Sequence, residues 1–308
     1  MYFYALRRIL AIIPMGLLVL TFTFFMLRYV PGGPYDGERE LPQEALAGIM
    51  SYYERDRPVL SQYAHYLGRI LCGDLGPSYC QVGWSVRELM ADRIGVSMEL
   101  GFYAFGLAMC LGCILGLFQA VNHGKFCDRW LASAEIFFIC MPTFVLGPVL
   151  CYVFVHRLCW FDAFGWSSWK NKILPVATLS LQYVAFLGRL TRQSMHDQST
   201  QLYVRSARAK GLTRWQIFLR HIFPNGISPV IAYLGSTCAG VLSGTFVVEN
   251  LFNIPGLGRL FIQAISNRDY TVISGIVLVY MALIVVCNLV SDLVLVAIDP
   301  RIRLRVDR

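Results

Sequence analysis

Charged residues are scarce in this sequence. They make up 15% of its 308 residues, whereas 56% are hydrophobic and the mean hydropathy is +0.54. A soluble globular domain carries about 25% charged residues. The short alternating segments of a membrane β-barrel are absent too, because the apolar runs are long and continuous. The composition therefore excludes an ordinary soluble domain and indicates an α-helical membrane protein.

Catalytic motifs are also absent. The phosphate-binding pattern Gly-x-x-x-x-Gly-Lys-Ser/Thr does not occur, since Gly124-Lys125 lacks both the earlier glycine and the hydroxyl residue. Neither His-Glu-x-x-His nor Gly-x-Ser-x-Gly is present. We therefore expect no ATP hydrolysis by this chain, no catalytic residue, no cofactor of its own and no metal site.

The cysteines form no clear disulfide or metal pattern. Most of the ten lie in apolar stretches, where a thiol behaves as a small hydrophobic group. Cys110-x-x-Cys113 has redox or zinc spacing, but no second pair or histidine accompanies it. Cys72 and Cys80 both lie in the loop after the first apolar run and could form a disulfide with each other, and this alternative stays open.

Long apolar runs are abundant. A helix needs about 20 apolar residues to cross a bilayer, and six runs have roughly this length. They are Ile9–Val30, Gly95–Ala120, Leu131–Val155, Ile173–Leu190, Pro229–Val248 and Val272–Ile298. The predicted fold is an all-α polytopic membrane protein with six transmembrane helices. Arg7-Arg8 resembles the start of a signal peptide, but the run that follows is too long and lacks a cleavage site. The first run is therefore interpreted as an uncleaved membrane span.

The distribution of Lys and Arg predicts that both termini are cytoplasmic. The 27 basic residues then divide into 15 inside and 12 outside, and the 19 acidic residues into 6 and 13. One outer loop, around Arg157, Lys170 and Lys172, is basic against this rule. Because anionic lipids attract cytoplasmic basic residues, the basic excess indicates membrane lipid as a partner, and nucleic acid is not implied.

Residues 31–94 are predicted to form an extracytoplasmic helical insertion. The segment is too long for a simple connection, and Pro42 and Pro58 stand where helices begin. Each predicted helix has one apolar face. The faces consist of Leu46, Ile49, Met50 and Tyr53, and of Tyr63, Leu67, Ile70 and Leu71. This small cap either serves packing alone or offers a docking surface.

A solvated segment separates the fourth and fifth apolar runs. Its centre, Tyr203–Pro224, reads YVRSARAKGLTRWQIFLRHIFP and contains basic residues but no acid. Gly211 stands where a helix ends in a left-handed residue, with Lys210 in the last turn. Thr213-x-x-Gln216 is a capping box. We therefore predict two short helices joined by a sharp turn, within a cytoplasmic loop at residues 195–228.

The second of these helices is predicted to be amphipathic. Its apolar face consists of Trp215, Phe218, Leu219 and Ile222, and its polar face of Arg214, Arg220 and His221. A DNA-binding helix-turn-helix has a similar composition, but spans at both ends would hold this one against the bilayer. A lipid-surface helix is an alternative. The small residues Ser206, Ala207, Ala209 and Gly211 favour close approach by another protein.

Ala207, Gly211 and Pro224 resemble the cytoplasmic EAA loop of binding-protein-dependent ABC importers, with the usual Gly-to-Pro spacing of thirteen positions. The Glu-Ala-Ala opening appears here as Arg205-Ser206-Ala207, and His221 and Phe223 replace smaller aliphatic residues. In that family the loop couples transport to a separate ATPase subunit. The resemblance implies that the ATPase contacts are Tyr203, Arg205, Ser206, Ala207, Arg208, Ala209, Lys210, Gly211 and Pro224.

The resemblance covers nearly the whole chain. Five segments are similar to the peptide/nickel permease family, and most similar to the first membrane subunit of its oligopeptide importers. They are RYVPGGPYDGERELPQEAL after the first run, GDLGPSY at Gly73–Tyr79, ARAKGL at Ala207–Leu212, NIPGLGRLFIQAISNRDY at Asn253–Tyr270 and DPRIR at Asp299–Arg303.

This family resemblance implies that residues 1–308 are one permease domain of the type I importer fold in the bacterial cytoplasmic (inner) membrane. The implied partners are a homologous second permease subunit, two ATPase subunits that bind ATP and Mg, and an extracytoplasmic peptide-binding protein. The cargo would be oligopeptides, with dipeptides, nickel or another small solute as alternatives. An ion-coupled secondary transporter, which would need mid-membrane charges and an inverted repeat, or a membrane scaffold are the alternatives of another class.

Small residues recur inside two of the runs and predict close helix packing. One set is Gly112-x-x-x-Gly116. In the fifth run the sets are Gly235, Ala239 and Ser243, and Ser236, Gly240 and Gly244. They are interpreted as helix contacts, with pathway lining as the alternative.

Overall fold

The computed structural model describes residues 2–29, 58–81, 83–162 and 164–298, and within these ranges the regular structure is entirely helical. The helices have the following bounds: α1 Tyr2–Tyr29, α3 Val59–Leu71, α4 Val86–Val121, α5 Phe126–Cys140, α6 Thr143–Cys151, η1 Tyr152–Arg157, α7 Trp169–Ser199, α8 Leu202–Ala209, α9 Arg214–Ile217, η2 Phe218–Ile222, α10 Phe223–Gly226, α11 Ser228–Leu251, α12 Leu257–Ser266 and α13 Tyr270–Ile298.

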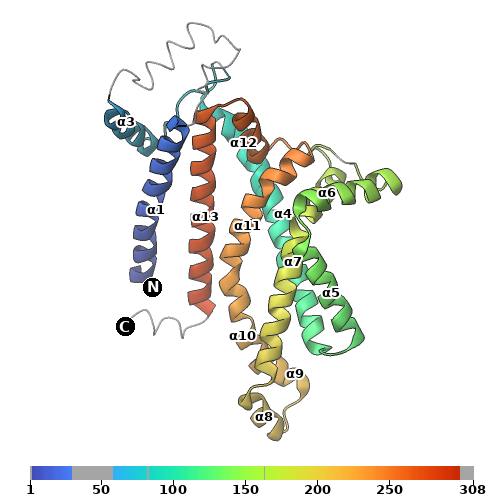
Figure 1. Cartoon of the computed structure of the whole chain (residues 1–308). Helices are drawn as coiled ribbons and strands as arrows, with labels where there is room; N and C mark the ends of the chain where they lie inside the picture. The colour runs from blue at the N-terminus through green and yellow to red at the C-terminus, as the bar shows by residue number, and fades with distance from the viewer. Residues whose placement is uncertain (1, 30–57, 82, 163, 299–308) are drawn as a thin grey trace.

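The long helices run side by side as an elongated bundle, with α4 and α7 packed together at its centre (Figure 1). α1 begins and α13 ends at the same end of the bundle as α8, α9 and α10. α3 and α12 lie at the opposite end. This arrangement agrees with the predicted cytoplasmic location of both termini and of the loop between α7 and α11.

Four of the predicted spans form continuous helices. Among the described residues, α4, α7, α11 and α13 are long and apolar enough to cross a membrane. α1 covers most of the first predicted span. The part of α1 whose side chains the structure describes, Ile13–Met26, is apolar but shorter than a full membrane span. The sequence places these helices well because long apolar runs are the clearest signal of a transmembrane helix.

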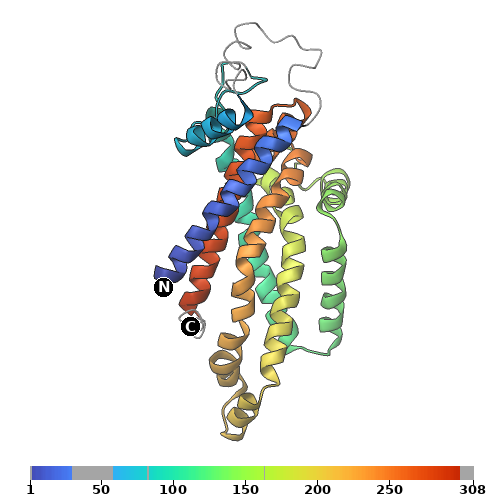
Figure 2. The ribbon, with the colours of Figure 1, turned by 60° about the vertical axis from the view of Figure 1, so that its left-hand side comes forward.

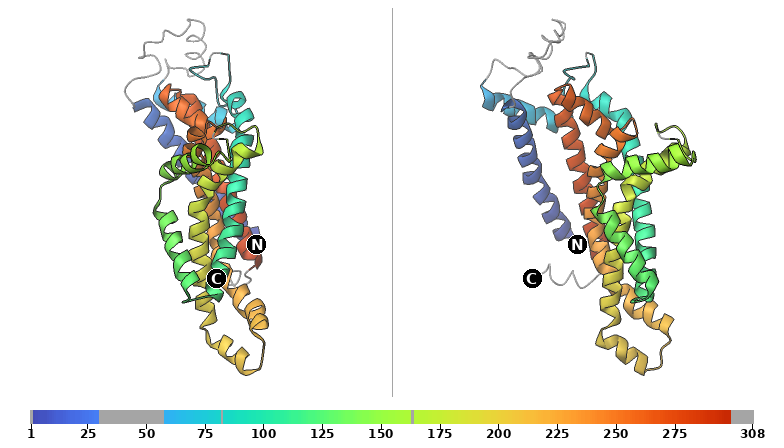
Figure 3. Two further views of the ribbon diagram at one scale, coloured as in Figure 1. Left: turned by 90° about the vertical axis from the view of Figure 1, so that its right-hand side faces the viewer. Right: turned by 45° about the vertical axis from the view of Figure 1, so that its right-hand side comes forward.

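The third predicted span, Leu131–Val155, is not one straight helix. α5 and the following segment Thr143–Arg157 meet at an angle of 108°. The cause is local, because Met141 precedes Pro142 and has an extended backbone with ψ of 116°. A residue before proline is pushed out of the α-helical region. α6 therefore leaves the bundle sideways (Figure 3), and its continuation widens into a π-helix at η1.

The interior of the bundle is built mainly from α4, α7, α11 and α13. A capping box formed by Ser85 and Glu88 begins α4. Towards the outer end, buried residues of α4, α12 and α13 surround Leu257 and Ile276. A second cluster joins α4, α7 and α11 around Leu100, Leu179 and Phe252. The central helices are thus held together by close apolar packing, and in a membrane the van der Waals contact between helices provides this stabilisation.

Part of the predicted extracytoplasmic cap is described. α3 begins directly after Pro58, as predicted, and Tyr63 packs against the rings of Phe24 and Phe25 at the outer end of α1. Leu71 does not share this packing, because its side chain is 87% exposed. The helix predicted after Pro42 and its apolar face lie outside the described residues, as does the DPRIR segment.

The arrangement predicts which cysteine substitutions are labelled from outside intact cells. Gln81 lies in the outer turn before α4, and Ser206 is exposed on α8 at the opposite end of the bundle. In a background in which the native exposed cysteines are replaced, Gln81→Cys should react with a membrane-impermeant maleimide and Ser206→Cys should not. Permeabilised cells provide the control, since Ser206→Cys should then react. Labelling of Ser206→Cys in intact cells would contradict the topology.

Candidate functional site

The segment between α7 and α11 folds into a compact helical tip at one end of the bundle (Figures 1 and 3). We call α8 to α10 with their connecting turn, residues 202–226, the tip. It contains the predicted pair of short helices: α8, and α9 with its continuation through η2 and α10. The tip is connected to the ends of two membrane-length helices, so its position and the positions of α7 and α11 depend on one another.

The turn between the two helices depends on Gly211. Its φ is +78°, the left-handed region predicted from the sequence. Its N–H donates to the carbonyl of Arg208 at 3.0 Å, and the N–H of Leu212 donates to the carbonyl of Ala207 at 3.3 Å. These two bonds form a Schellman motif, which satisfies the last carbonyls of α8. A Cβ atom at Gly211 would meet nothing within 4 Å, so the requirement for glycine here is one of backbone conformation.

The predicted capping box at the start of α9 is confirmed. The Gln216 N–H donates to Thr213 Oγ1 at 3.4 Å, and the Thr213 N–H donates to Gln216 Oε1 at 3.0 Å. Two of the unsatisfied N–H groups at the helix start are thereby paired. Together with the Gly211 turn, the box fixes the angle at which the second helix leaves the first.

The apolar face predicted for the second helix differs in the structure. Ile217 and Ile222 are buried, whereas Trp215 is 72% and Leu219 58% exposed. Trp215 precedes the π-helix η2, and its separation of two residues from Ile217 places it on the opposite side of the helix. Beyond Ile217 the helix widens into η2, whose turns each contain an extra residue. Ile222, five positions after Ile217, therefore shares its buried side, and Leu219 does not.

The inward surface of the tip is a small apolar core. It packs against Leu117 and Ala120 near the end of α4, and the Ser194 hydroxyl of α7 donates to the Gly226 carbonyl at 2.6 Å. The buried members are Met195, Val204, Ala207, Ile217 and Ile222. The tip is therefore held by packing to both α4 and α7, and a force on it is transmitted to those helices.

The outward surface contains most of the residues predicted to contact an ATPase. Ala207 is the exception, because its side chain is only 5% exposed and belongs to the inward core. Its small size therefore permits close packing inside the tip. The exposed members are Tyr203, Arg205, Ser206, Arg208, Ala209, Lys210, Gly211 and Pro224. Sequence reasoning missed the exposed Leu202 and Trp215, which add apolar area to this surface.

The Tyr203 side chain links the two halves of the tip. Its hydroxyl lies 2.7 Å from Gln198 Oε1 and 3.3 Å from the His221 carbonyl oxygen. Partial burial raises the pKa of the Tyr203 phenol further above its ordinary value, at which the hydroxyl is already a protonated donor at neutral pH. Tyr203 thus has a structural role in addition to its predicted place on the contact surface.

The outward surface is positively charged. Within the part of the chain that the structure describes, Arg205, Arg208 and Lys210 have no acidic partner within salt-bridge distance. Such a surface attracts an acidic protein surface or anionic lipid. The motifs that fix the backbone of the tip lie between its buried inner face and this exposed outer face.

The chain is similar to known transport proteins along its whole length. Residues 111–304 match the family model of the binding-protein-dependent transport system inner membrane component. The oligopeptide transport system permease protein OppB of Haemophilus influenzae is 37% identical, with 96% of this chain and 98% of that protein covered. OppB of Escherichia coli is also 37% identical, with 97% and 99% covered. The dipeptide transport system permease protein DppB of Bacillus subtilis is 36% identical, with 98% of both covered.

Solved structures share the fold. An inward-facing conformation of the MetNI methionine ABC transporter superposes with a TM-score of 0.59 at 15% identity, and it covers 68% of this chain and 96% of the transporter chain. An amino acid ABC transporter crystallised with histidines superposes with a TM-score of 0.53 at 19% identity, with 67% and 92% covered. At these identities the similarity concerns the fold.

Proposed function

The chain belongs to the family of inner membrane components of binding-protein-dependent transport systems, and from this premise we propose that it is a membrane permease subunit of an ATP-driven peptide importer. It is a multi-pass protein of the bacterial inner membrane. An extracytoplasmic binding protein delivers the peptide, and a homologous second permease subunit completes the pathway. Two ATPase subunits, which bind ATP and Mg, supply the energy.

The observation that carries the coupling part of this proposal is the two-sided tip. Its outward surface is exposed, basic and free of bulky side chains along Ser206 and Ala209, which suits docking into a groove of an ATPase subunit. Its inward surface packs on α4 and α7. A displacement of the docked tip therefore moves the central helices as well. Closure of the ATPase pair on ATP would in this way switch the permease between outward and inward access.

Peptide is the cargo that the relatives support. The oligopeptide and dipeptide permeases are nearly equally identical to this chain, at 37% and 36%, and both are covered almost completely. Identity therefore does not separate the two cargo lengths. We propose oligopeptides as the primary cargo because segments such as GDLGPSY and NIPGLGRLFIQAISNRDY are most similar to the first membrane subunit of the oligopeptide importers.

A reconstitution experiment tests this function. The chain is purified with its second permease and two ATPase subunits, inserted into liposomes, and supplied with peptide-loaded binding protein and ATP. Labelled peptide should accumulate only when all components are present. Omission of the ATPase subunits should abolish uptake. Because an ion-coupled transporter would work without ATPases, peptide uptake by this chain alone, driven by a proton or sodium gradient, would refute the proposal.

A membrane scaffold makes a different prediction. It would bind partners through the basic tip but would not require ATP turnover for its activity. If the complete assembly hydrolyses ATP without peptide uptake under any loading of the binding protein, the importer function is contradicted.

A further inference from the structure

α5 is attached to the bundle in an unusual way. Its only buried side chains are two acids, Asp128 and Glu135, which are seven residues apart and therefore on one face. Large apolar side chains such as Phe126 and Trp130 point outwards instead. Since acids in a membrane helix are costly unless they are paired, the contacts of these two residues determine how α5 is held.

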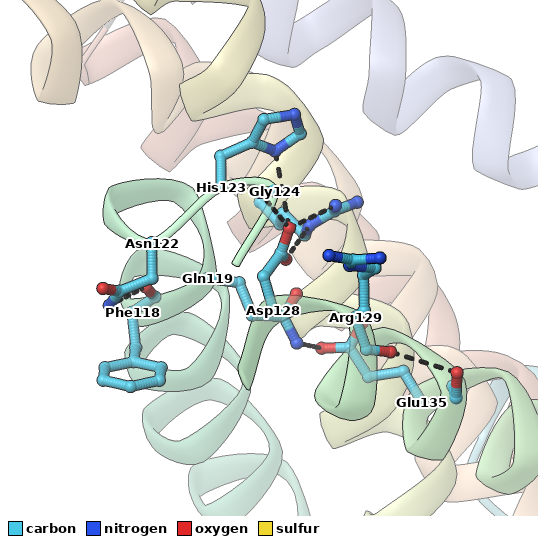
Figure 4. Close-up of polar contacts among 10 residues, drawn as sticks. Phe118, Gln119, Asn122, His123, Gly124, Asp128, Arg129 and Glu135 are labelled. Atoms are coloured by element: carbon cyan, nitrogen blue, oxygen red, sulfur yellow. Dashed lines mark hydrogen bonds and ion pairs between the residues drawn. The ribbon is translucent and has the colours of Figure 1, made fainter. Parts of the chain in front are cut away.

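Asp128 is the better satisfied of the two. Its carboxylate is 1% exposed and accepts from Arg192 of α7 at 2.6 Å and 2.9 Å, in the two-pronged geometry that makes such pairs strong. The Gly124 N–H donates to the same carboxylate at 2.8 Å, and His123 Nδ1 lies 3.7 Å away (Figure 4). The His123 ring in turn stacks on His196 of α7. The α4–α5 turn is thus fixed to α7.

Glu135 connects α5 to α4. Its Oε1 accepts from Gln119 Nε2 of α4 at 2.7 Å (Figure 4). It also lies against Gly188 of α7, where a Cβ would be 2.6 Å from the same oxygen. The buried contacts that attach α5 to the bundle are therefore polar, whereas those among α4, α7 and α11 are mainly apolar. Figure 2 shows α5 at the edge of the bundle, beside α7.

The Asp128–Arg192 pair lies next to the tip. Ser194 and Met195 follow Arg192 within one helical turn of α7, and both contact the tip. Arg192 is thus placed between the tip and the inner face of α5. Directional contacts to charged groups hold a fixed geometry better than apolar contacts do, because both hydrogen bonds must keep their angles.

From this arrangement we propose that the Asp128–Arg192 ion pair is a joint through which α5 moves together with α7 and the tip. Arg192 and Asp128 are positioning residues in this proposal and contact neither peptide nor nucleotide. The inference rests on the proposed importer function. Without the ion pair, the ATPase subunits would still dock on the tip. A displacement of the tip and α7 would then move α5 less than it does in the wild type.

The test uses the complete reconstituted transporter with peptide-loaded binding protein. The variants are Asp128→Asn, Arg192→Gln and the double variant, which removes both charges and leaves no unpaired buried ion. Peptide uptake and ATP hydrolysis are measured in the same vesicles. For each single variant we expect about a tenfold fall in peptide moved per ATP hydrolysed, within the usual range of coupling effects. Hydrolysis without binding protein should stay near the wild-type rate.

Matched controls are available on the same helix. Arg189 is an exposed arginine one turn from Arg192, and Asp197 is an exposed acid near the end of α7. Arg189→Gln and Asp197→Asn should both keep the wild-type peptide-to-ATP ratio. The double variant should be less impaired than the product of the two single effects, since residues in one ion pair are not additive.

The ratio of peptide moved to ATP hydrolysed distinguishes a joint from a contact that only stabilises the fold. If the variants lower the amount of assembled transporter but the remaining complexes move as many peptides per ATP as wild type, the proposal is wrong. It is equally overturned if the double variant folds and transports with the normal ratio. The wild-type complex, measured in parallel, reports on the importer function itself, so the two failures are distinguishable.

Discussion

Replacement of Gly211 by valine is expected to reduce peptide uptake steeply while the amount of protein in the membrane stays near normal. Gly211 has a φ of +78° and closes the Schellman motif at the end of α8. A β-branched residue in this conformation costs about 1–2 kcal/mol. Each 1.4 kcal/mol or so changes an equilibrium about tenfold. The strain is too small to unfold the bundle, but it is released when α8 shifts away from its docking position.

The expected readouts are uptake in reconstituted vesicles and ATP hydrolysis with and without loaded binding protein. Uptake should fall about tenfold, in line with the strain estimate, and hydrolysis should lose its response to the loaded binding protein. Gly211→Asn should be milder, because asparagine tolerates the left-handed region. Lys210→Ala, which removes a charge near the end of α8, should also be mild.

A valine under the same strain at another site provides the matched control. Gly73 has a φ of +76° and nothing within 4 Å of its missing Cβ, but it lies in the outer turn after α3. Gly73→Val should therefore leave the link between ATP hydrolysis and uptake intact. If Gly211→Val transports normally, or if Lys210→Ala is the more damaging change, the tip is a lipid-surface element and its proposed contact with the ATPase is wrong.

The conformation at Gly211 was predictable because it depends on local chemistry. The left-handed glycine and the Thr213–Gln216 capping box each involve residues within a few positions of one another, and both appear as predicted. The side of the tip to which Ala207 faces was not predictable. Its burial depends on a core that the tip shares with α7 and with Leu117 of α4, and Leu117 is distant in sequence. A small residue on a helix indicates close approach by a neighbour without indicating which neighbour it is.

The bend in the third apolar run could not be predicted from hydropathy. Hydropathy averages over a window, so Leu131–Val155 scores as one span although Met141 and Pro142 redirect the chain by 108°. The proline was visible in the sequence, but prolines are tolerated within membrane helices, as Pro148 and Pro175 are here. The importance of Asp128 and Glu135 was missed for a related reason. Their spacing of seven was the available signal, but their partners Arg192 and Gln119 lie on other helices.

The small residues of the fifth run have mixed roles. Gly235 packs against Asn288 and Ser291 of α13, while Gly240 and Gly244 pack against α7 at Tyr183 and Leu179. These are helix contacts, as interpreted from the sequence. Ser236 and Ser243 are exposed instead. A repeat of small residues therefore marks two different surfaces of α11, which a sequence pattern alone does not separate.

The contact between α4 and α7 provides the prediction with the largest effect on stability. Gly112 and Gly116 allow these helices to approach closely, as the Gly-x-x-x-Gly pattern predicts. A Cβ on Gly116 would overlap the Gly188 carbonyl oxygen. It would also lie 2.5 Å from Thr191 Cβ and 3.0 Å from the backbone nitrogen of Arg192. Backbone atoms cannot rotate out of the way as a side chain can. Gly116→Ala must therefore push the two central helices apart, and overpacking of this kind costs about 1–3 kcal/mol.

Gly106→Ala is the matched control, since Gly106 lies on the same helix and has nothing within 4 Å of its missing Cβ. Alanine is the better helix former by about 0.8–1.0 kcal/mol, so this variant should be neutral or slightly more stable than wild type. Gly116→Ala should change stability in the opposite direction, with a lower thermal unfolding midpoint and a smaller monodisperse fraction in detergent. If both variants unfold at the wild-type temperature, the close contact between α4 and α7 is not what holds the centre of the bundle together, and the tip cannot transmit its displacement through a rigid α4–α7 pair.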